Sequence, residues 1–219
     1  MASVSTAPAP AANGLQNRTS RLTLVIALGA GIAAVALLLP AWPAGTDMGA
    51  THYMGLLTAN QPWNLLLFMA TPVILAETVA VTELVILFSA RASRVVRALN
   101  RWAGLIGGFY FVGVFFYLLK HAVIPLTTDG GWRGPADLVA VGFYLLGIVP
   151  LFGLALLETR VVGEAWDDRT RLKAHATLVG IFLVVAHIAM ITGMVDPAVM
   201  GWDPSHMMDG NSPMPGLQH

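Results

Sequence analysis

The sequence predicts an all-α protein, an integral membrane bundle of five transmembrane helices. The chain is 56% apolar with only 11% charged residues, and its mean hydropathy is +0.70, whereas an ordinary soluble domain carries roughly 25% charged residues. Five apolar segments are each long enough to cross a bilayer, which takes about 20 helical residues. Basic residues gather in alternate loops between these segments, as expected of a multi-pass membrane protein.

The apolar segments follow one another with short connections. They are residues 22–42, 62–90, 102–124, 137–157 and 172–195. The preceding residues, 1–21, are rich in Ala, Ser, Pro and Asn, a composition that predicts a disordered cytoplasmic N-terminus. Residues 196–219 form a tail with many Pro, Gly and Met. The expected organisation is therefore an N-terminal segment 1–21, a transmembrane domain 22–195 and a tail 196–219.

Positive charges predict which way the bundle faces. The loops on one side hold most of them, whereas the loops on the other side contain only Arg133. The basic residues of the first side are Arg18, Arg21, Arg91, Arg94, Arg97, Arg101, Arg160, Arg169, Arg171 and Lys173. Because short cytoplasmic loops carry an excess of Lys and Arg, the N-terminus is expected in the cytoplasm and the C-terminal tail outside it. A cleaved signal peptide is the alternative for the first segment, but its apolar run exceeds the usual length of about 7–15 residues.

Two carboxylates, Glu77 and Glu83, interrupt the second apolar segment. An ionisable side chain in hydrocarbon is costly unless it is paired, neutralised or hydrated, so such residues mark functional sites. Six residues turn a helix by about 240°, and the two carboxylates therefore do not form a catalytic pair on one face. Glu83 is expected to reach the cytoplasmic interface or to meet His175, which leaves Glu77 as the functional candidate. Pro72 lacks an N–H, so the carbonyl about one turn earlier needs another donor.

Histidines are the expected partners of Glu77. His121 and His187 lie in the outer halves of the third and fifth segments, and His52 precedes the second segment in a stretch that predicts a short interfacial helix. Imidazole binds zinc, copper, iron and haem, so these three histidines and Glu77 form a candidate metal site. Lys120, beside His121, is a candidate for a proton or solute pathway together with Glu77.

We expect one interior cavity in the outer half of the bundle. Glu77, His121 and His187 should point into it, with Tyr53 or Tyr117 near its mouth. The same two histidines, His121 and His187, are the candidate axial ligands of a single haem b, although their estimated depths differ.

Soft ligands characterise the tail. Thioether sulfur selects Cu(I), and imidazole or carboxylate accepts Cu(II). The candidate ligands are Met200, His206, Met207, Met208, Met214 and His219. We expect His206, Met207, Met208 and Met214 to capture copper rather than to support the fold. The alternative is a solvated tail whose Met content has no role.

The chain resembles a family of uncharacterised bacterial inner-membrane proteins that are loosely labelled permeases. The likeness lies in short motifs between about residues 50 and 200. The motifs are His-Tyr-Met-Gly-Leu-Leu at 52–57, Asn-Gln-Pro-Trp-Asn at 60–64, Pro-Val-Ile-Leu-Ala-Glu at 72–77, Trp-Arg-Gly-Pro-Ala-Asp at 132–137 and Ala-His-Ile-Ala-Met at 186–190. The resemblance implies a multi-pass protein of the bacterial inner membrane and brings no established ligand or activity.

Several function classes are not expected. The net charge is zero, so no basic surface indicates nucleic acid. The chain has no cysteine, which excludes disulfides, thiolate metal sites and iron–sulfur ligation. No nucleophile with a base, phosphate loop or dinucleotide fingerprint is present, so a self-contained enzyme is not expected.

Three functions remain open. The first is metal handling, with copper favoured, through the His/Glu site and the Met/His tail. The second is a haem b redox subunit that exchanges electrons with quinol or a partner enzyme, and the third is a small proton or solute transporter in which Glu77 titrates. Besides the lipid bilayer, a homo-oligomer or a larger membrane complex is the expected partner, because so short a chain holds only a minimal pathway.

Overall fold

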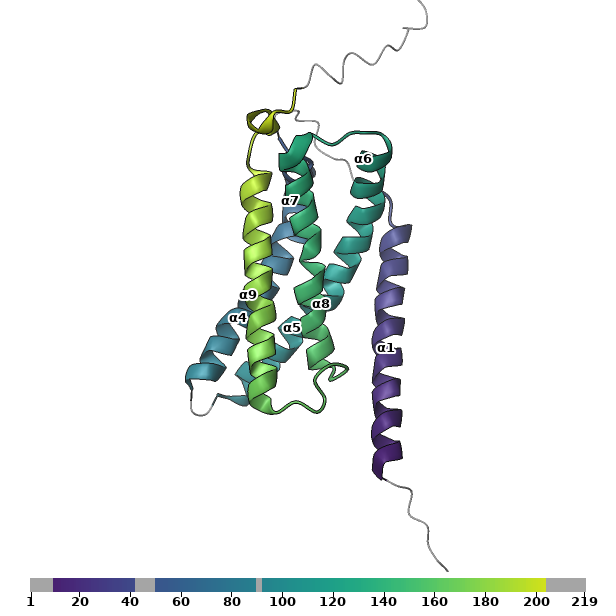
Figure 1. The fold of residues 1–219 in the computed structure, drawn as a ribbon, viewed down its shortest axis with the longest axis vertical. Helices are drawn as coiled ribbons and strands as arrows, with labels where there is room; N and C mark the ends of the chain where they lie inside the picture. The colour runs from purple at the N-terminus through teal and green to yellow at the C-terminus, as the bar shows by residue number, and fades with distance from the viewer. Residues whose placement is uncertain (1–9, 42–49, 90–91, 204–219) are drawn as a thin grey trace, which may run out of the picture.

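The described chain is a bundle of membrane-length helices. A computed structural model describes residues 10–41, 50–89 and 92–203, and Figure 1 shows them as an all-helical fold. Within these residues there is no strand, and five helical spans are long and apolar enough to cross a membrane. They are Gln16–Leu38, Trp63–Phe88, Arg94–Thr128, Gly134–Glu158 and Asp168–Gly193. The predicted fold class and the predicted number of spans are confirmed.

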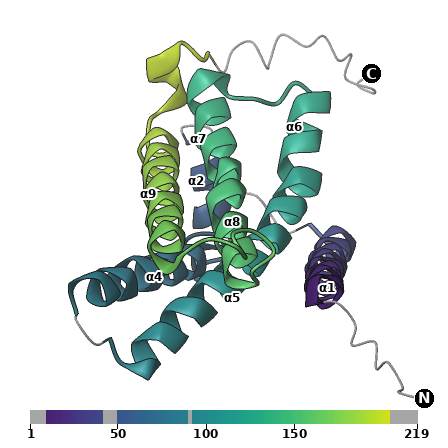
Figure 2. The same cartoon turned by 60° about the horizontal axis from the view of Figure 1, so that its bottom comes forward.

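The first helix begins earlier than the sequence indicates. Helix α1 runs over Pro10–Leu38, so residues 10–21, predicted to be disordered, are helical. Pro10 stands at the first helical position, where its missing N–H costs no hydrogen bond. Helix α1 packs against α5 (Arg94–Leu118) and stands at the side of the other helices (Figure 2). Most of its described side chains are exposed, as expected of a helix that faces lipid.

A short helix precedes the second span, as predicted. Helix α2 covers His52–Thr58, and its N-cap Thr51 accepts a hydrogen bond from the Met54 N–H at 3.3 Å. The fully buried Thr51 hydroxyl also donates to the Gly193 carbonyl at 2.7 Å, at the end of α9 (Asp168–Gly193). This contact fixes α2 against the last span.

The second span contains a π-helical turn just before Pro72. It consists of α3 (Trp63–Leu65), the π-helix η1 (Leu66–Ala70) and α4 (Thr71–Phe88). Pro72 lacks the N–H that would reach Phe68 O in an α-helix or Leu67 O in a π-helix. Tyrosine hydroxyls replace it, because Tyr144 donates to Phe68 O and Tyr110 donates to Leu67 O at 2.8 Å. The predicted need for a donor is confirmed.

Tyr144→Phe should destabilise the bundle because it leaves the Phe68 carbonyl without this donor. A lost hydrogen bond costs about 0.5–1.5 kcal/mol, so the thermal midpoint in detergent should fall by a few degrees. Tyr117→Phe is the matched control, since its hydroxyl reaches Pro40 O at a longer 3.3 Å. Equal midpoints for Tyr144→Phe and the wild type would show that the carbonyl does not depend on Tyr144.

Helix α5 is the centre of the bundle and contacts α1, α4 and α8 (Ile148–Glu158). It continues through a second π-helix, η2 (Leu119–Val123), into α6 (Ile124–Thr128). Its N-cap Ser93 accepts from the Val96 N–H at 3.3 Å. The third span is thereby longer at both ends than the predicted segment 102–124.

The fourth span joins two helices at Gly147, and the chain then crosses once more. Helix α7 (Gly134–Leu146) is followed by α8, and α9 leads to the short 3-10 helix η3 (Pro197–Met200). We call the end that holds the α4–α5 and α8–α9 connections the basic end, and the opposite end, with α2, α6 and η3, the far end (Figure 1). The described basic residues at the basic end are Arg94, Arg97, Arg101, Arg160, Arg169, Arg171 and Lys173. Their gathering at one end agrees with the predicted charge asymmetry, and the orientation in the membrane stays a prediction.

Candidate functional site

A cavity of about 280 Å³ lies between the second and last spans. We call it the central cavity. Its walls are mainly aromatic and aliphatic, and Glu77 and His187 both line it. Two thioethers, Met69 and Met190, line it as well. Glu77 and His187 therefore line one cavity, but both side chains are exposed, so this cavity opens at the surface of the bundle instead of lying in its interior as predicted. Their role as site residues stays a prediction, and the two methionines were missed.

His187 has one ring nitrogen free for a ligand. Its Nδ1 lies 2.6 Å from the Leu183 carbonyl of its own helix. A carbonyl oxygen only accepts, so Nδ1 carries a hydrogen, and in the neutral form of the ring Nε2 has the lone pair. Metal-binding histidines commonly hold their ring in this way, with the second nitrogen on a backbone carbonyl.

Met69, His187 and Met190 come from two different spans and line the same cavity. Helices α4 and α9 run in opposite directions and touch where Glu83 meets His175. From that contact Met69 is 14 residues away along the second span, and His187 and Met190 are 12 and 15 residues away along α9. At 1.5 Å per residue these positions are about 18–22 Å from the contact along their own helices. The three side chains therefore line the part of the cavity remote from the Glu83–His175 contact.

A second cavity, of about 240 Å³, lies toward the far end. His52 and His121 line it, and Tyr53 and Tyr144 line both cavities. The two tyrosine rings are 5.2 Å apart, centroid to centroid, and stand between the cavities. Burial raises the pKa of the Tyr53 hydroxyl to about 12, so it stays neutral at physiological pH. The prediction of one cavity shared by Glu77, His121 and His187 is wrong for His121.

Local contacts explain where His121 points. It lies in the π-helix η2, its ring packs on Tyr117 at 4.7 Å between centroids, and its Nε2 donates to the Leu39 carbonyl at 3.0 Å. Lys120 donates to the Leu37 carbonyl. Both side chains thus serve carbonyls at the C-terminal end of α1, where cations and donors are favourable. Lys120 does not line the cavity of Glu77, and His121 and His187 do not share a cavity that would hold a haem.

Asp137 holds the far end together and was not predicted as a site residue. It is fully buried and accepts from the His52 N–H at 2.7 Å, from His52 Nδ1 at 2.6 Å and from the Arg133 N–H at 3.2 Å. The buried Arg133 guanidinium in turn donates to the Ala50 carbonyl. His52 is therefore fixed by Asp137, with its Nε2 left for other contacts.

A second group of buried charges lies toward the basic end. Glu83 of α4 contacts His175 Nδ1, and Glu158 of α8 lies 3.1 Å from His175 Nε2. We call these three residues the Glu–His–Glu cluster. The predicted meeting of Glu83 and His175 is confirmed, although His175 is buried rather than interfacial. Glu158 was missed because the predicted fourth segment ended at residue 157, which left this carboxylate in a loop.

Several predicted metal ligands are not tested by this geometry. His206, Met207, Met208 and Met214 lie outside the described residues. Across residues 10–41, 50–89 and 92–203, no group of three or more His, Asp or Glu side chains is arranged to hold a metal ion. The thioether and imidazole side chains of the central cavity are a different, softer set of groups.

Comparison with known proteins gives a family without an assigned activity. The model described as "Family of unknown function (DUF6803)" matches residues 48–209, so the chain belongs to this family. The match includes the second to fifth spans and excludes α1. No curated protein and no solved structure matches the chain. The expected kinship with an uncharacterised family is confirmed, and the permease label stays a hypothesis.

Proposed function

We propose that this member of a family of unknown function binds and moves Cu(I) within the bilayer, with Met69, His187 and Met190 as the ligands. The observation that carries the proposal is that these two thioethers and this imidazole line the same cavity. The resemblance to bacterial inner-membrane proteins called permeases supports the transport part of this proposal. The choice of copper as the transported ion comes from the side chains of the cavity.

The ligand chemistry favours a soft monovalent metal. Thioether sulfur selects Cu(I), and neutral imidazole accepts the same ion. His187 offers Nε2 because its Nδ1 is held by Leu183 O. Hard divalent cations such as Mg²⁺ and Ca²⁺ require mainly oxygen ligands, and within the described part of the chain Glu77 is the only carboxylate that lines the central cavity. A thioether-rich site therefore discriminates against them.

Glu77 supplies the counter-charge. It is eight residues from Met69 along the second span, about 12 Å, so it does not lie beside that ligand. A bare cation in a low-dielectric cavity is costly unless an opposite charge is near. The Glu77 carboxylate lowers this cost without coordinating the ion.

A route from the far end follows from the two cavities. The tail residues His206, Met207, Met208 and Met214 capture the ion, and His52 and His121 in the second cavity receive it. Tyr53 and Tyr144 separate this cavity from the central one, so their rings must shift for the ion to pass. The haem b alternative lacks comparable support, because its two histidines line different cavities.

Replacing the thioethers should weaken Cu(I) binding. In Met69→Leu and Met190→Leu the volume is nearly kept while the sulfur is lost, and each should reduce Cu(I) affinity at least about tenfold, as loss of metal-site groups typically does. His187→Gln should act similarly. The measurement is competition between the purified full chain and a chromophoric Cu(I) chelator in detergent.

Met194→Leu is the matched control, since Met194 ends the same helix, is 65% exposed and does not line the cavity. Its affinity should equal that of the wild type. Glu77→Gln should bind Cu(I) more weakly but keep the stoichiometry. If the Met69→Leu/Met190→Leu double variant and His187→Gln both keep wild-type affinity, the central cavity is not the copper site, and transport of a proton or another solute becomes the better hypothesis.

A further inference from the structure

The Glu–His–Glu cluster has no part in the proposed copper site. Its three side chains come from three different spans, α4, α8 and α9, and Glu83 and His175 are 4% and 6% exposed. We propose that this cluster is a proton-exchange site, in which His175 passes one proton between Glu158 and Glu83. The inference stands independently of copper binding.

The charges of the cluster do not balance. Each ring nitrogen of His175 faces a carboxylate oxygen, Nδ1 toward Glu83 and Nε2 toward Glu158. A carboxylate only accepts, so a proton lies between the ring and each carboxylate only when the ring is an imidazolium. Two carboxylates and one imidazolium then leave a net charge of −1 inside a membrane span, which is costly. One further proton neutralises the cluster, so two states that differ by a single proton compete.

The cluster is also not locked by directional hydrogen bonds. Among the described buried side-chain atoms, Glu83 Oε1 and both ring nitrogens of His175 lie close to opposite charges without hydrogen-bond geometry. Buried polar atoms in this condition are unusual and often mark functional groups. A purely structural ion pair would instead be held by well-formed bonds.

Helix α5 closes one side of the cluster with small and neutral groups. A side chain at Gly104 would lie 3.7 Å from Glu158 Cγ and 3.9 Å from His175 Nε2. One turn earlier, the buried Asn100 donates to Val79 O at 3.2 Å and to Thr82 Oγ1 at 2.9 Å, beside Glu83. The charged residues of this part of α5, Arg97 and Arg101, are exposed.

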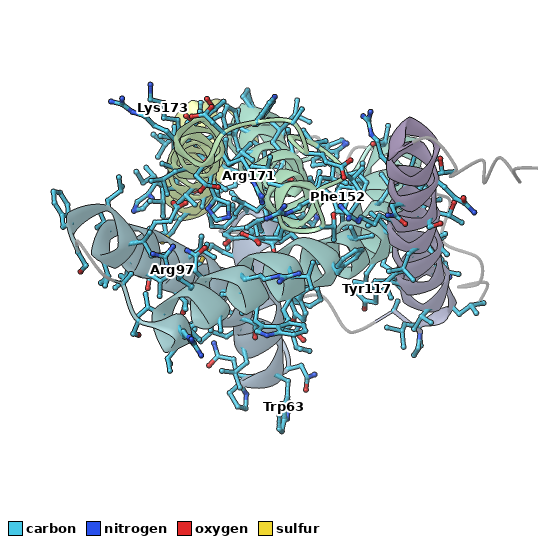
Figure 3. The ribbon with its side chains drawn as sticks, turned by 90° about the horizontal axis from the view of Figure 1, so that it is seen from below. Trp63, Arg97, Tyr117, Phe152, Arg171 and Lys173 are labelled. Atoms are coloured by element: carbon cyan, nitrogen blue, oxygen red, sulfur yellow. The ribbon has the colours of Figure 1, made fainter. Side chains whose placement is uncertain are left out.

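The basic end gives the cluster access to the aqueous phase. Glu158 ends α8, and its side chain is 14% exposed, against 5% for Glu83. Arg171, one turn before His175 on α9, donates to the Leu157 carbonyl at 2.9 Å beside Glu158. Figure 3 shows Arg171 between α8 and α9 and Lys173 pointing away from the bundle. Arg171 is therefore the cation that faces the entrance, and α4 adds only Glu83 and, about 9 Å farther in, Glu77.

In the starting state both ring nitrogens of His175 carry a hydrogen and both glutamates are carboxylates. Glu158 takes a proton from water, and His175 gives its Nδ1 proton to Glu83 and becomes neutral. The ring then turns so that its bare nitrogen faces Glu158 and accepts the proton of that carboxyl group. Glu158 is again a carboxylate, the ring is again an imidazolium, and Glu83 is a neutral acid. One proton has entered and no other bond has changed.

Infrared difference spectroscopy tests this site in the metal-free full chain. As the pH is lowered from about 9 to about 5, the wild type should gain a buried carboxyl band that corresponds to about one newly protonated carboxyl group per chain. Glu83→Gln should lose this band, and Glu158→Gln should lose or shift it. The control Glu164→Gln removes an exposed carboxylate paired with Arg21 and should leave the band unchanged.

Nitrogen NMR of histidine-labelled wild-type protein covers the case in which a variant fails to fold. The His175 signal, assigned with His175→Gln, should change over the same pH range as the carboxyl band. A wild-type spectrum in which neither the carboxyl band nor the His175 signal changes with pH would overturn the proposal. So would a band that survives in Glu83→Gln and Glu158→Gln. These outcomes do not depend on whether the chain binds copper, because the measurements use metal-free protein.

Discussion

Asp137→Asn is expected to lower the free energy of unfolding by about 3–5 kcal/mol, because it disrupts hydrogen bonds to a buried carboxylate that contribute about 1.5–3 kcal/mol each. Asp137 is fully buried and accepts three hydrogen bonds from His52 and Arg133. The asparagine amide keeps the shape of the carboxylate. Its NH₂ group, however, cannot accept the hydrogen bonds that His52 and Arg133 donate to one of the carboxylate oxygens. For a chain of this size the loss corresponds to a fall in the thermal midpoint of roughly 6–20 °C, measured in mild detergent.

Two further variants show whether the loss comes from this pair. Asp129→Asn changes an exposed carboxylate in the same far-end loop and should stay within about 0.5 kcal/mol of the wild type. In a double-mutant cycle, His52→Gln should destabilise much less when Asp137 is already Asn, because the two residues are bonded directly. Additive effects would contradict a direct contribution of the His52–Asp137 pair.

Gly108→Ala should separate the two most closely packed spans. A Cβ at this position would lie 2.6 Å from Ala155 Cβ and 2.6 Å from the Leu151 carbonyl, and neither group is flexible. Helices α5 and α8 would have to move apart, and overpacking of this kind costs about 1–3 kcal/mol or more. Small residues at such contacts are what allows membrane helices to approach closely. The variant should show a lower thermal midpoint and a larger fraction of aggregated protein in size-exclusion chromatography.

Gly142→Ala is the matched control, because no atom lies within 4 Å of the added carbon. Alanine favours the helix over glycine by up to about 1 kcal/mol, so this variant should be as stable as the wild type or slightly more so. If Gly108→Ala and Gly142→Ala have the same midpoint, the α5–α8 contact does not depend on the missing side chain.

Local sequence determined the elements of this protein. The length and hydropathy of each apolar segment predict a span, because a bilayer accepts few backbone structures other than a helix of about 20 residues. The short helix His52–Thr58 and the donor requirement created by Pro72 also follow from nearby residues. The meeting of Glu83 with His175 was predictable from depth alone, since two polar groups at one level of an apolar bundle tend to pair.

The partners across the bundle were decided only by the tertiary structure. Glu158 joins Glu83 and His175 because α8 extends one residue beyond its apolar run and faces both helices. His121 turns toward α1 and away from His187 because it lies in a π-helical turn, which changes the angular spacing of side chains. Met69 lines the same cavity as His187 and Met190 because the second and last spans pack against each other. Hydropathy fixes how deep a residue lies, whereas helix rotation and register decide which residues face one another, and these depend on contacts between segments far apart in the chain.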